Sequence, residues 1–357
     1  MKMTNLSSLL SKTLQLDADF YLTENDFRSQ RFLFEGMSQF SELSQMKNAG
    51  MFDFETVLLL RSDISLPKPA IFSEDFLKNS APGQIAGFVL IERQPNSDSG
   101  RNDSGTCLVF TPIVSDSKTK DEFFGILKDL ISSPFDFSAS HCLNISFSDL
   151  FSDVIEYYAE TALSFFKESG SLPPYDSVYS PSRVQKAAQT IQKTEDLSGC
   201  RFLSSDLNVL EICCGNGMST LALYEKKISP ICVDINAEDV CIGLSHGVLK
   251  PNKTIIADAS ALSQNFDTNS FDTVIGFMIG TIYEFNKNLW FSIVEEAVGV
   301  LKSNGFLLLT LRSENEAVWI SDFLKEKGII GEIFDNRDDE TNYDEWIYFA
   351  VKIAVKN

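Results

Sequence analysis

The spacing of apolar and polar residues changes along the chain, and the change falls near residue 180. Before it, three segments rich in Val, Leu, Ile and Phe are bounded by turn-forming residues and predict β-strands at Glu55–Arg61, Gln84–Glu92 and Thr106–Ile113. A polar loop rich in Gly, Ser and Asn joins the second and third segments, which is typical of a hairpin. We therefore expect an antiparallel sheet in an N-terminal α+β domain.

Helical spacing fills much of the remaining N-terminal part. A Phe-rich stretch at residues 4–48 and a second one at 119–132 predict helices, and apolar residues recur at helical intervals over Asp149–Glu168. The segment Ser169–Tyr179 contains a Pro-Pro pair that a helix interior does not accept. We therefore place a domain boundary there, with domains at residues 1–170 and 171–357. Ser180, an N-cap residue type, precedes a proline and predicts the start of a new helix.

From Asn208 onward, strand-like and helix-like segments alternate, which predicts an α/β domain with a parallel sheet. The first strand ends in a turn that contains Gly215 and Gly217, where the missing side chains let a ligand approach the backbone. The second strand, Ile228–Asn236, ends close to Asp234. The offset from Glu211 is 234 − 211 = 23 residues, near the ~20 residues at which an acid meets a ribose in nucleotide-binding folds. This pairing predicts a bound nucleoside.

Two nucleoside cofactors compete for such a site, a nicotinamide dinucleotide and S-adenosylmethionine. The dinucleotide fingerprint requires a third glycine, but Thr220 stands in its place. Glu211 precedes the turn, where its carboxylate would repel a pyrophosphate and could accept a hydrogen bond from an ammonium group. Electrostatics therefore favour S-adenosylmethionine.

These motifs resemble those of the class I S-adenosylmethionine-dependent methyltransferases, especially enzymes of the ubiquinone- and menaquinone-biosynthesis type. The similarity covers residues ~180–357 and rests on motifs in the family's order. They are the glycine turn Val209–Thr220, the ribose strand end Val233–Ile235, the adenine segment Ala257–Ala259, the turn Phe266–Val274 into the fourth strand, the turn Leu301–Gly305 before the fifth, and two last strands at Ile329–Phe334 and Trp346–Ile353.

The resemblance implies a Rossmann-like sheet that is mostly parallel with an antiparallel last strand. It also implies a set of residues around S-adenosylmethionine: Tyr179, Arg183, Glu211, Cys213, Gly215, Asn216, Gly217, Asp234, Ile235, Asp258, Ala259 and Met278. Two departures stand out. Cys213 replaces the first glycine of the turn, and nothing after the fourth strand resembles the Asn/Asp-Pro-Pro-Tyr/Phe motif of enzymes that methylate exocyclic or amide nitrogens.

Methyl transfer needs few catalytic residues, because the enzyme mainly aligns the acceptor with the methyl group and excludes water. Tyr283 and Glu284 are candidates for a base, although a surface role fits each equally well. The loop Asp335–Glu345 carries six carboxylates and could attract a cationic acceptor, whereas a solvated turn explains it as well. We interpret His246 as structural.

The amino-acid composition disfavours some classes of binding partner. The net charge of −20, without a basic patch, disfavours nucleic acid and anionic membranes. Seven scattered cysteines lack metal-ligand spacing and predict reduced, buried thiols. Neither a signal peptide nor an apolar run of membrane length is apparent, so we expect a cytoplasmic protein.

We expect an S-adenosylmethionine-dependent methyltransferase that acts on a small molecule or a protein side chain. The alternatives are a catalytically silent cofactor-binding scaffold and, less favoured, a nicotinamide-dependent oxidoreductase. The N-terminal domain is interpreted as a substrate-selecting or dimerising module.

Overall fold

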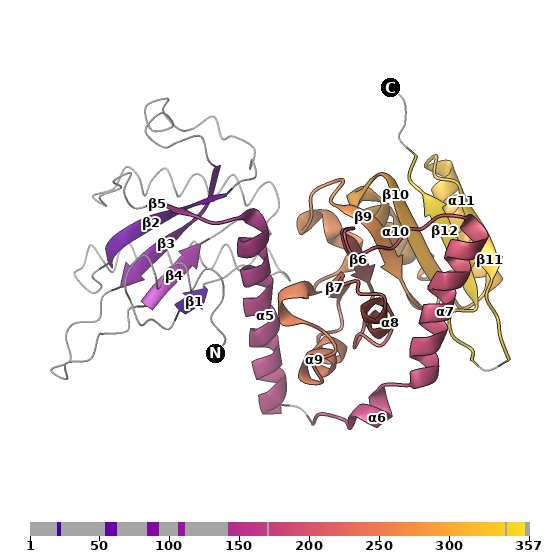
Figure 1. The fold of residues 1–357 in the computed structure, drawn as a ribbon, viewed down its shortest axis with the longest axis horizontal. Coiled ribbons are helices and arrows are strands. Elements are labelled where there is room, and N and C mark those ends of the chain that lie inside the picture. Colours follow the sequence, from indigo (N-terminus) through magenta and orange to yellow (C-terminus); the bar gives the residue numbers. More distant parts are fainter. Residues whose placement is uncertain are drawn as a thin grey trace. The chain divides into compact units, whose positions relative to one another are not determined.

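The computed structural model (Figure 1) describes four strands in the first 141 residues and then residues 142–169, 171–339 and 341–353. The chain divides into two compact units, Met1–Tyr157 and Tyr158–Asn357. This division lies inside helix α5 (Phe147–Ser169), which matches the helix predicted at Asp149–Glu168. The boundary predicted at residue 170 follows the same helix.

The first unit contains a five-stranded sheet in the order β1-β4-β3-β2-β5. Its strands are β1 (Phe20–Leu22), β2 (Phe54–Ser62), β3 (Gln84–Glu92), β4 (Thr106–Phe110) and β5 (Cys142–Asn144). The pairs β2·β3 and β3·β4 are antiparallel, which confirms the predicted arrangement of three strands. Parallel pairs β1·β4 and β2·β5 extend the sheet on both sides.

The helix predicted over residues 4–48 is wrong at β1, where pairing with β4 overrides the local preference. The rest of that segment, the helix predicted at 119–132 and the polar loop between β3 and β4 lie outside the described residues.

The second unit contains a seven-stranded sheet in the order β11-β12-β10-β9-β6-β7-β8. Its strands are β6 (Val209–Ile212), β7 (Ile231–Asp234), β8 (Thr254–Ile256), β9 (Phe271–Gly276), β10 (Leu301–Leu311), β11 (Gly331–Asp335) and β12 (Trp346–Val351). Strand β12 is antiparallel to β10 and β11, and the other neighbouring pairs are parallel. The Rossmann-like sheet with an antiparallel last strand is therefore confirmed.

The helices of this unit follow from local sequence signals. Ser180 stands at the N-cap position of α7, before Pro181, without a side-chain capping hydrogen bond, and Asn236 caps α9 through its side chain. Ser313 and Glu316 form a capping box at α11. The helices are α6 (Tyr175–Val178), α7 (Pro181–Ser198), α8 (Thr220–Glu225), α9 (Ala237–Ser245), α10 (Lys287–Val300) and α11 (Glu314–Glu326), with 3₁₀ turns η2 (Pro251–Lys253) and η3 (Ala259–Gln264).

The core lies on the central strands, and all four residues of β6 are buried. Such continuous burial is typical of a parallel strand covered on both faces. Ala187 and Ile191 of α7 and Ala222 of α8 belong to one apolar cluster with Ile275 of β9 and Leu308 of β10. In a second cluster, the C-terminal part of α5 packs through Ala159 on residues of β7 and α9.

One predicted turn has a different structure. Residues Leu301–Gly305, expected to precede the fifth strand, lie inside β10. The pairing with β9 shifts register between Leu301 and Phe306, and Asn304 adopts a φ of 65° there. The turn residues are accommodated as an irregularity within the strand because pairing resumes on both sides of it.

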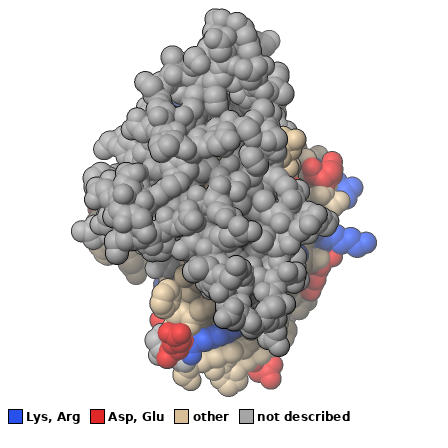
Figure 2. Space-filling view, turned by 90° about the vertical axis from the view of Figure 1, so that its left-hand side faces the viewer, with Lys and Arg blue, Asp and Glu red and all other residues tan. Residues whose placement is uncertain are grey.

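The cysteines of the described residues are free thiols, as predicted, and three of the five are buried. Cys214, Cys232 and Cys241 are buried free thiols, and Cys200 and Cys213 are half-buried free thiols. In Figure 2, acidic and basic side chains of described residues lie beside one another. None of the helices in the described ranges combines the length and apolarity that crossing a bilayer requires.

Candidate cofactor site

The strand order places a potential ligand site between β6 and β9. From β6 the chain adds β7 and β8 on one side of the sheet, and β9 and β10 lie on the other side. In open α/β sheets, ligands bind at such a reversal, outside the carboxyl ends of the strands. The predicted residues that follow β6, β7, β8 and β9 therefore share this edge of the sheet.

The turn after β6 consists largely of residues with positive φ. Gly215 has a φ of 53° and Gly217 a φ of 82°. Cys213, which replaces a family glycine, has a φ of 55°, so a side chain is carried here in the left-handed region that costs non-glycine residues roughly 1–2 kcal/mol. Burial, followed by the nearby Asp234 and Asp258, raises the pKa of the Cys213 thiol to about 12, so this thiol is neutral.

The two turn glycines have different surroundings. A Cβ at Gly217 would lie 2.6 Å from Leu249 Cδ2, whereas a Cβ at Gly215 would have no heavy atom within 4 Å. A third glycine, Gly243 of α9, lets that helix approach the turn, since a Cβ there would lie 2.5 Å from the Asn216 carbonyl oxygen. The turn is thus closely packed beneath Gly217 and open beside Gly215.

Asp234, at the end of β7, is hydrogen-bonded to the turn. Its Oδ2 accepts from Gly215 N at 2.7 Å and its Oδ1 accepts from Asn236 N at 2.7 Å. A carboxylate offers about four acceptor positions, so each oxygen can accept a further donor such as a ribose hydroxyl. The next side chain, Ile235, is 66% exposed.

Glu211 is a buried acid, with 1% of its surface exposed. Thr220 Oγ1 donates to its Oε2 at 2.7 Å, and Oε1 has no hydrogen-bond partner within the described part of the chain. Burial raises the pKa of this carboxyl to about 7. A buried carboxyl oxygen without a donor is rare in folded proteins, and it fits an external donor such as an ammonium group.

The residues predicted to contact adenine follow β8. Asp258 caps η3, where its Oδ1 accepts from Ser260 N at 2.8 Å, and Ala259 is buried beside it. The backbone just before them pairs with β7, because Ala257 N donates to Asp234 O at 3.0 Å. The segment predicted to contact adenine therefore lies next to Asp234.

Tyr179 reaches the glycine turn, and Arg183 lies elsewhere. Tyr179 Oη donates to Asn216 O at 2.9 Å, and burial raises the pKa of this phenol. The guanidinium carbon of Arg183 lies 4.2 Å above the ring centre of Tyr343, in the loop before β12. Among the described contacts, Arg183 is thus joined to the acidic loop.

The segment after β9 carries Met278 and the two candidate bases. Met278 has a φ of 45° and is half-buried. Tyr283 and Glu284 are exposed just before α10, where the Tyr283 ring stacks on Phe285 and Glu284 lies 3.8 Å from Lys287.

Two hydrogen bonds from residues distant in the sequence hold the segment after β9, and neither was predicted. Met278 N donates to Thr310 Oγ1 at 2.7 Å, and Ile282 N donates to Glu316 Oε1 at 3.0 Å. Glu316 was detectable only as a helix-capping residue, and Thr310 lies within an apolar strand without any motif.

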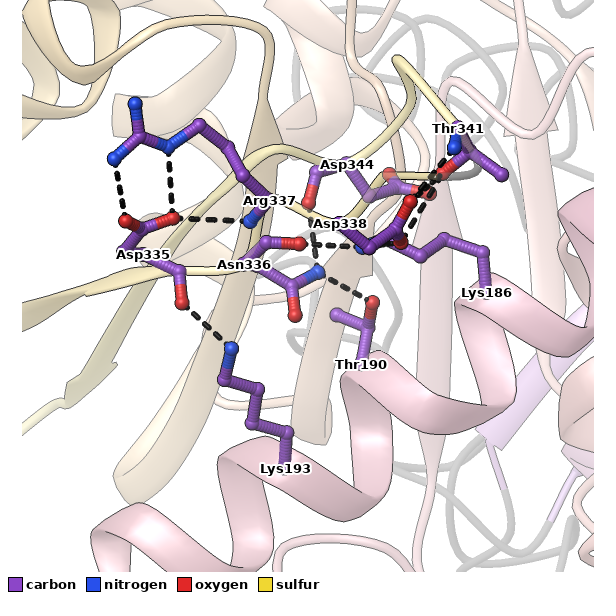
Figure 3. Close-up of polar contacts among 9 residues, drawn as sticks. All are labelled: Lys186, Thr190, Lys193, Asp335, Asn336, Arg337, Asp338, Thr341 and Asp344. Carbon is purple, nitrogen blue, oxygen red and sulfur yellow. Dashed lines mark hydrogen bonds and ion pairs between the residues drawn. The ribbon is translucent and has the colours of Figure 1, made fainter.

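Two carboxylates of the acidic loop Asp335–Glu345 pair with cations of the same unit (Figure 3). Asp335 pairs with Arg337 at 2.6 Å and Asp338 with Lys186 at 2.5 Å. Asp344 is buried, and its Oδ1 accepts from Thr310 Oγ1. These contacts account for three of the six carboxylates as structural groups.

Comparison with known proteins supports the interpretation of the second unit. Residues 209–305 match a family model described as a methyltransferase domain. A search of the curated proteins finds no match.

Several solved structures are similar. An S-adenosylmethionine-dependent methyltransferase from Methanosarcina mazei is 18% identical over 43% of this chain and 95% of that chain, with a TM-score of 0.31. One from Clostridium acetobutylicum is 15% identical over 56% and 98%, with a TM-score of 0.37. The magnesium protoporphyrin IX methyltransferase from Synechocystis, with bound S-adenosylmethionine, is 15% identical over 57% and 96%, with a TM-score of 0.36.

The strand order, the family match and the geometry of the edge agree with one another. The space beside Gly215 and the Asp234 carboxylate suit a nucleoside. The Glu211 Oε1, which has no donor among the described residues, suits an attached amino-acid group. Residues 209–305, in the C-terminal half of the chain, are therefore similar to a methyltransferase domain, and the sheet that contains them has the Rossmann-like topology.

Proposed function

We propose that this domain transfers a methyl group to a small molecule or a protein side chain, with Glu211, Asp234 and the turn after β6 holding the cofactor. The observation that carries the proposal is the buried Oε1 of Glu211, which has no donor among the described residues although Oε2 is satisfied by Thr220. Leaving such an oxygen unpaired costs about 1–3 kcal/mol. The ammonium group of S-adenosylmethionine would remove that cost.

S-adenosylmethionine supplies an electrophilic methyl group on a sulfonium ion. The chain's own contribution is to orient the cofactor and to shield the crevice between β6 and β9 from water. Asp234 would accept from the ribose hydroxyls, and Asp258 with Ala259 would lie along the adenine. Tyr179 and the turn would contact the methionine end, and Met278 would complete that side, whereas Arg183 lies over Tyr343 of the acidic loop.

We also propose Tyr283 and Glu284 as the groups to test for a base. Both are exposed and follow β9 in the chain, close in sequence to Met278. An acceptor with an acidic proton, such as a hydroxyl or thiol, would need such a base, whereas an unprotonated amine would not. The acidic loop also supports a cationic acceptor, although the pairing of Asp335 and Asp338 reduces its charge.

Calorimetry on the full chain tests the cofactor part of the proposal. We expect S-adenosylhomocysteine to bind and NADH not to bind. Asp234→Ala should weaken S-adenosylhomocysteine binding by about 1.5–3 kcal/mol, because a charge-assisted hydrogen bond is lost. Asp239→Asn is the matched control and should leave the dissociation constant unchanged. Asp239 is a neighbouring acid on α9, and its Oδ2 accepts a hydrogen bond from Asn236 Nδ2 at 2.7 Å.

Preferential binding of NADH would favour an oxidoreductase, and an unchanged dissociation constant in Asp234→Ala would remove Asp234 from the site. Turnover separates an enzyme from a silent scaffold. Metabolites and peptides of a strain that lacks the protein are incubated with the purified chain and isotope-labelled S-adenosylmethionine, and mass spectrometry detects the labelled methyl group. A bound cofactor without any labelled product would support the scaffold interpretation.

A further inference from the structure

Both strands that flank the proposed crevice are followed by a non-glycine residue with positive φ. After β6 this residue is Cys213, and after β9 it is Met278, with a φ of 45°. Non-glycine residues in this region are uncommon, and they persist only where surrounding contacts determine the backbone. The neighbours of Met278, Phe277 and Ile279, are buried, whereas Met278 itself is half-buried. The left-handed conformation thus occurs at the one residue of this triplet that reaches the surface.

A buried pair of side chains fixes this backbone. Met278 N donates to Thr310 Oγ1 at 2.7 Å, and the same hydroxyl donates to Asp344 Oδ1. Thr310 is completely buried and Asp344 nearly so. One hydroxyl therefore uses its proton on the carboxylate and a lone pair on the Met278 amide, which leaves it a single orientation.

Asp344 is itself held from the far side by α7 (Figure 3). Asn336 Nδ2 donates to Asp344 O at 2.7 Å and to Thr190 Oγ1 at 2.8 Å. Lys186 Nζ donates to Asn336 O and to Asp338 Oδ2. Because Thr190 and Lys186 are buried residues of α7, the chain of contacts runs from the α7 helix through the loop to the end of β9.

We propose that Thr310 and Asp344 are positioning residues that hold Met278 in its left-handed conformation and so shape the β9 side of the cofactor crevice. The proposal rests on the function proposed above. Without the Thr310 hydroxyl, Met278 would relax toward negative φ, and the backbone that follows β9, the neighbour of β6 in the sheet, would move. The left-handed conformation costs a non-glycine residue a free energy that corresponds to a factor of about 5 to 30 in an equilibrium constant. We therefore expect the affinity for the cofactor to fall by about this factor when the Thr310 hydroxyl is removed.

The first measurement needs no ligand. Hydrogen exchange of the full chain, followed by mass spectrometry, reports the peptide that contains the Met278 amide. We expect about tenfold faster exchange at this amide in Thr310→Val and parental exchange in Thr310→Ser, which keeps the hydroxyl. Thr273→Val is the matched control, since Thr273 is an equally buried threonine in β9 whose hydroxyl donates to Phe202 O at 2.6 Å. It should lose comparable stability without any change at Met278.

The second measurement links the conformation to the site. Thr310→Val should raise the dissociation constant of S-adenosylhomocysteine about tenfold. Glycine adopts positive φ without strain, so in a Met278→Gly background the same substitution should change the constant less than about threefold. Additive effects in the two backgrounds would overturn the proposal, as would parental exchange at Met278 in Thr310→Val.

If Thr310→Val fails to fold, Asp344→Asn and Asp344→Ala form the second test pair. The Asn variant retains an acceptor for the Thr310 hydroxyl and should match the parent in exchange at Met278, whereas the Ala variant should not. Equal exchange in the two would overturn the proposal. Absence of S-adenosylhomocysteine binding to the parent chain would instead contradict the proposed function, and the exchange measurements would still decide the role of Thr310.

Discussion

The two segments that flank the proposed crevice are fixed in different ways. The turn after β6 is fixed by residues close to it in the chain, with two glycines and a carboxylate 19 residues away at the end of the next strand. The segment after β9 is fixed by Thr310, Glu316 and Asp344, which are 32, 34 and more residues away. The turn after β6 is therefore built from a compact motif, whereas the segment after β9 depends on the assembled fold.

The largest effect is expected from packing beneath the turn. Gly217→Ala introduces a Cβ 2.6 Å from Leu249 Cδ2 at a φ of 82°. Overpacking and backbone strain together should lower the free energy of unfolding by about 2–5 kcal/mol, measured by denaturant titration.

Gly215→Ala is the matched control, because it has a φ of 53° and open space around its Cβ. It should cost about 1–2 kcal/mol of stability and weaken S-adenosylhomocysteine binding more strongly than its stability loss suggests. Equal stability losses in the two variants would contradict the distinct roles of the two glycines.

The next effect concerns the pH dependence of stability. Glu211 has a pKa raised by burial from 4.5 to about 7. Between these values the folded chain keeps a proton that the unfolded chain releases, so rising pH favours unfolding. The contribution of Glu211 to the free energy of unfolding should fall by up to about 3 kcal/mol from pH 4.5 to pH 7 and then level off.

Glu211→Gln isolates this contribution. The free energy of unfolding of the parent minus that of this variant should fall as pH rises through that window, because only the parent has an ionisable group at this position. A difference that stays constant would show that Glu211 ionises normally. Binding of S-adenosylhomocysteine near pH 7 should also release a proton, which calorimetry in buffers of different ionisation enthalpy detects.

The smallest effect is expected from the link between the turn and the residues before α7. Tyr179→Phe removes the hydrogen bond to Asn216 O and should cost about 0.5–1.5 kcal/mol of stability. Tyr175→Phe, in a ring that stacks on Tyr179 with centroids 4.5 Å apart, serves as the control and should cost less. A larger loss in Tyr175→Phe would show that the Tyr175 hydroxyl contributes more stability than the hydrogen bond from Tyr179 to Asn216 O.

The sequence predicted the sheet and the turn because both depend on short patterns. Apolar runs with turn residues located the strands, and the pair of glycines with Glu211 and Asp234 located the edge where the cofactor is proposed to bind. The position of Arg183 over Tyr343 joins residues 160 positions apart and leaves no local signal. The same holds for Thr310, whose hydroxyl is used only after β9 and β10 have paired.

The fold of the first unit shows the same limit. The strands β2, β3 and β4 were readable from their composition, but β1 is a strand only because β4 lies beside it. The turn predicted at Leu301–Gly305 became part of β10 for a similar reason, since pairing with β9 continues on both sides of it.

The close approach of Gly243 to the Asn216 carbonyl has a consequence for engineering. A methyl group at this point of α9 would push the helix and the glycine turn apart. The turn and the helix could therefore be transplanted into a related domain only together. A chimera that imports a loop from one protein and the following helix from another should therefore preserve a residue without a side chain at this place.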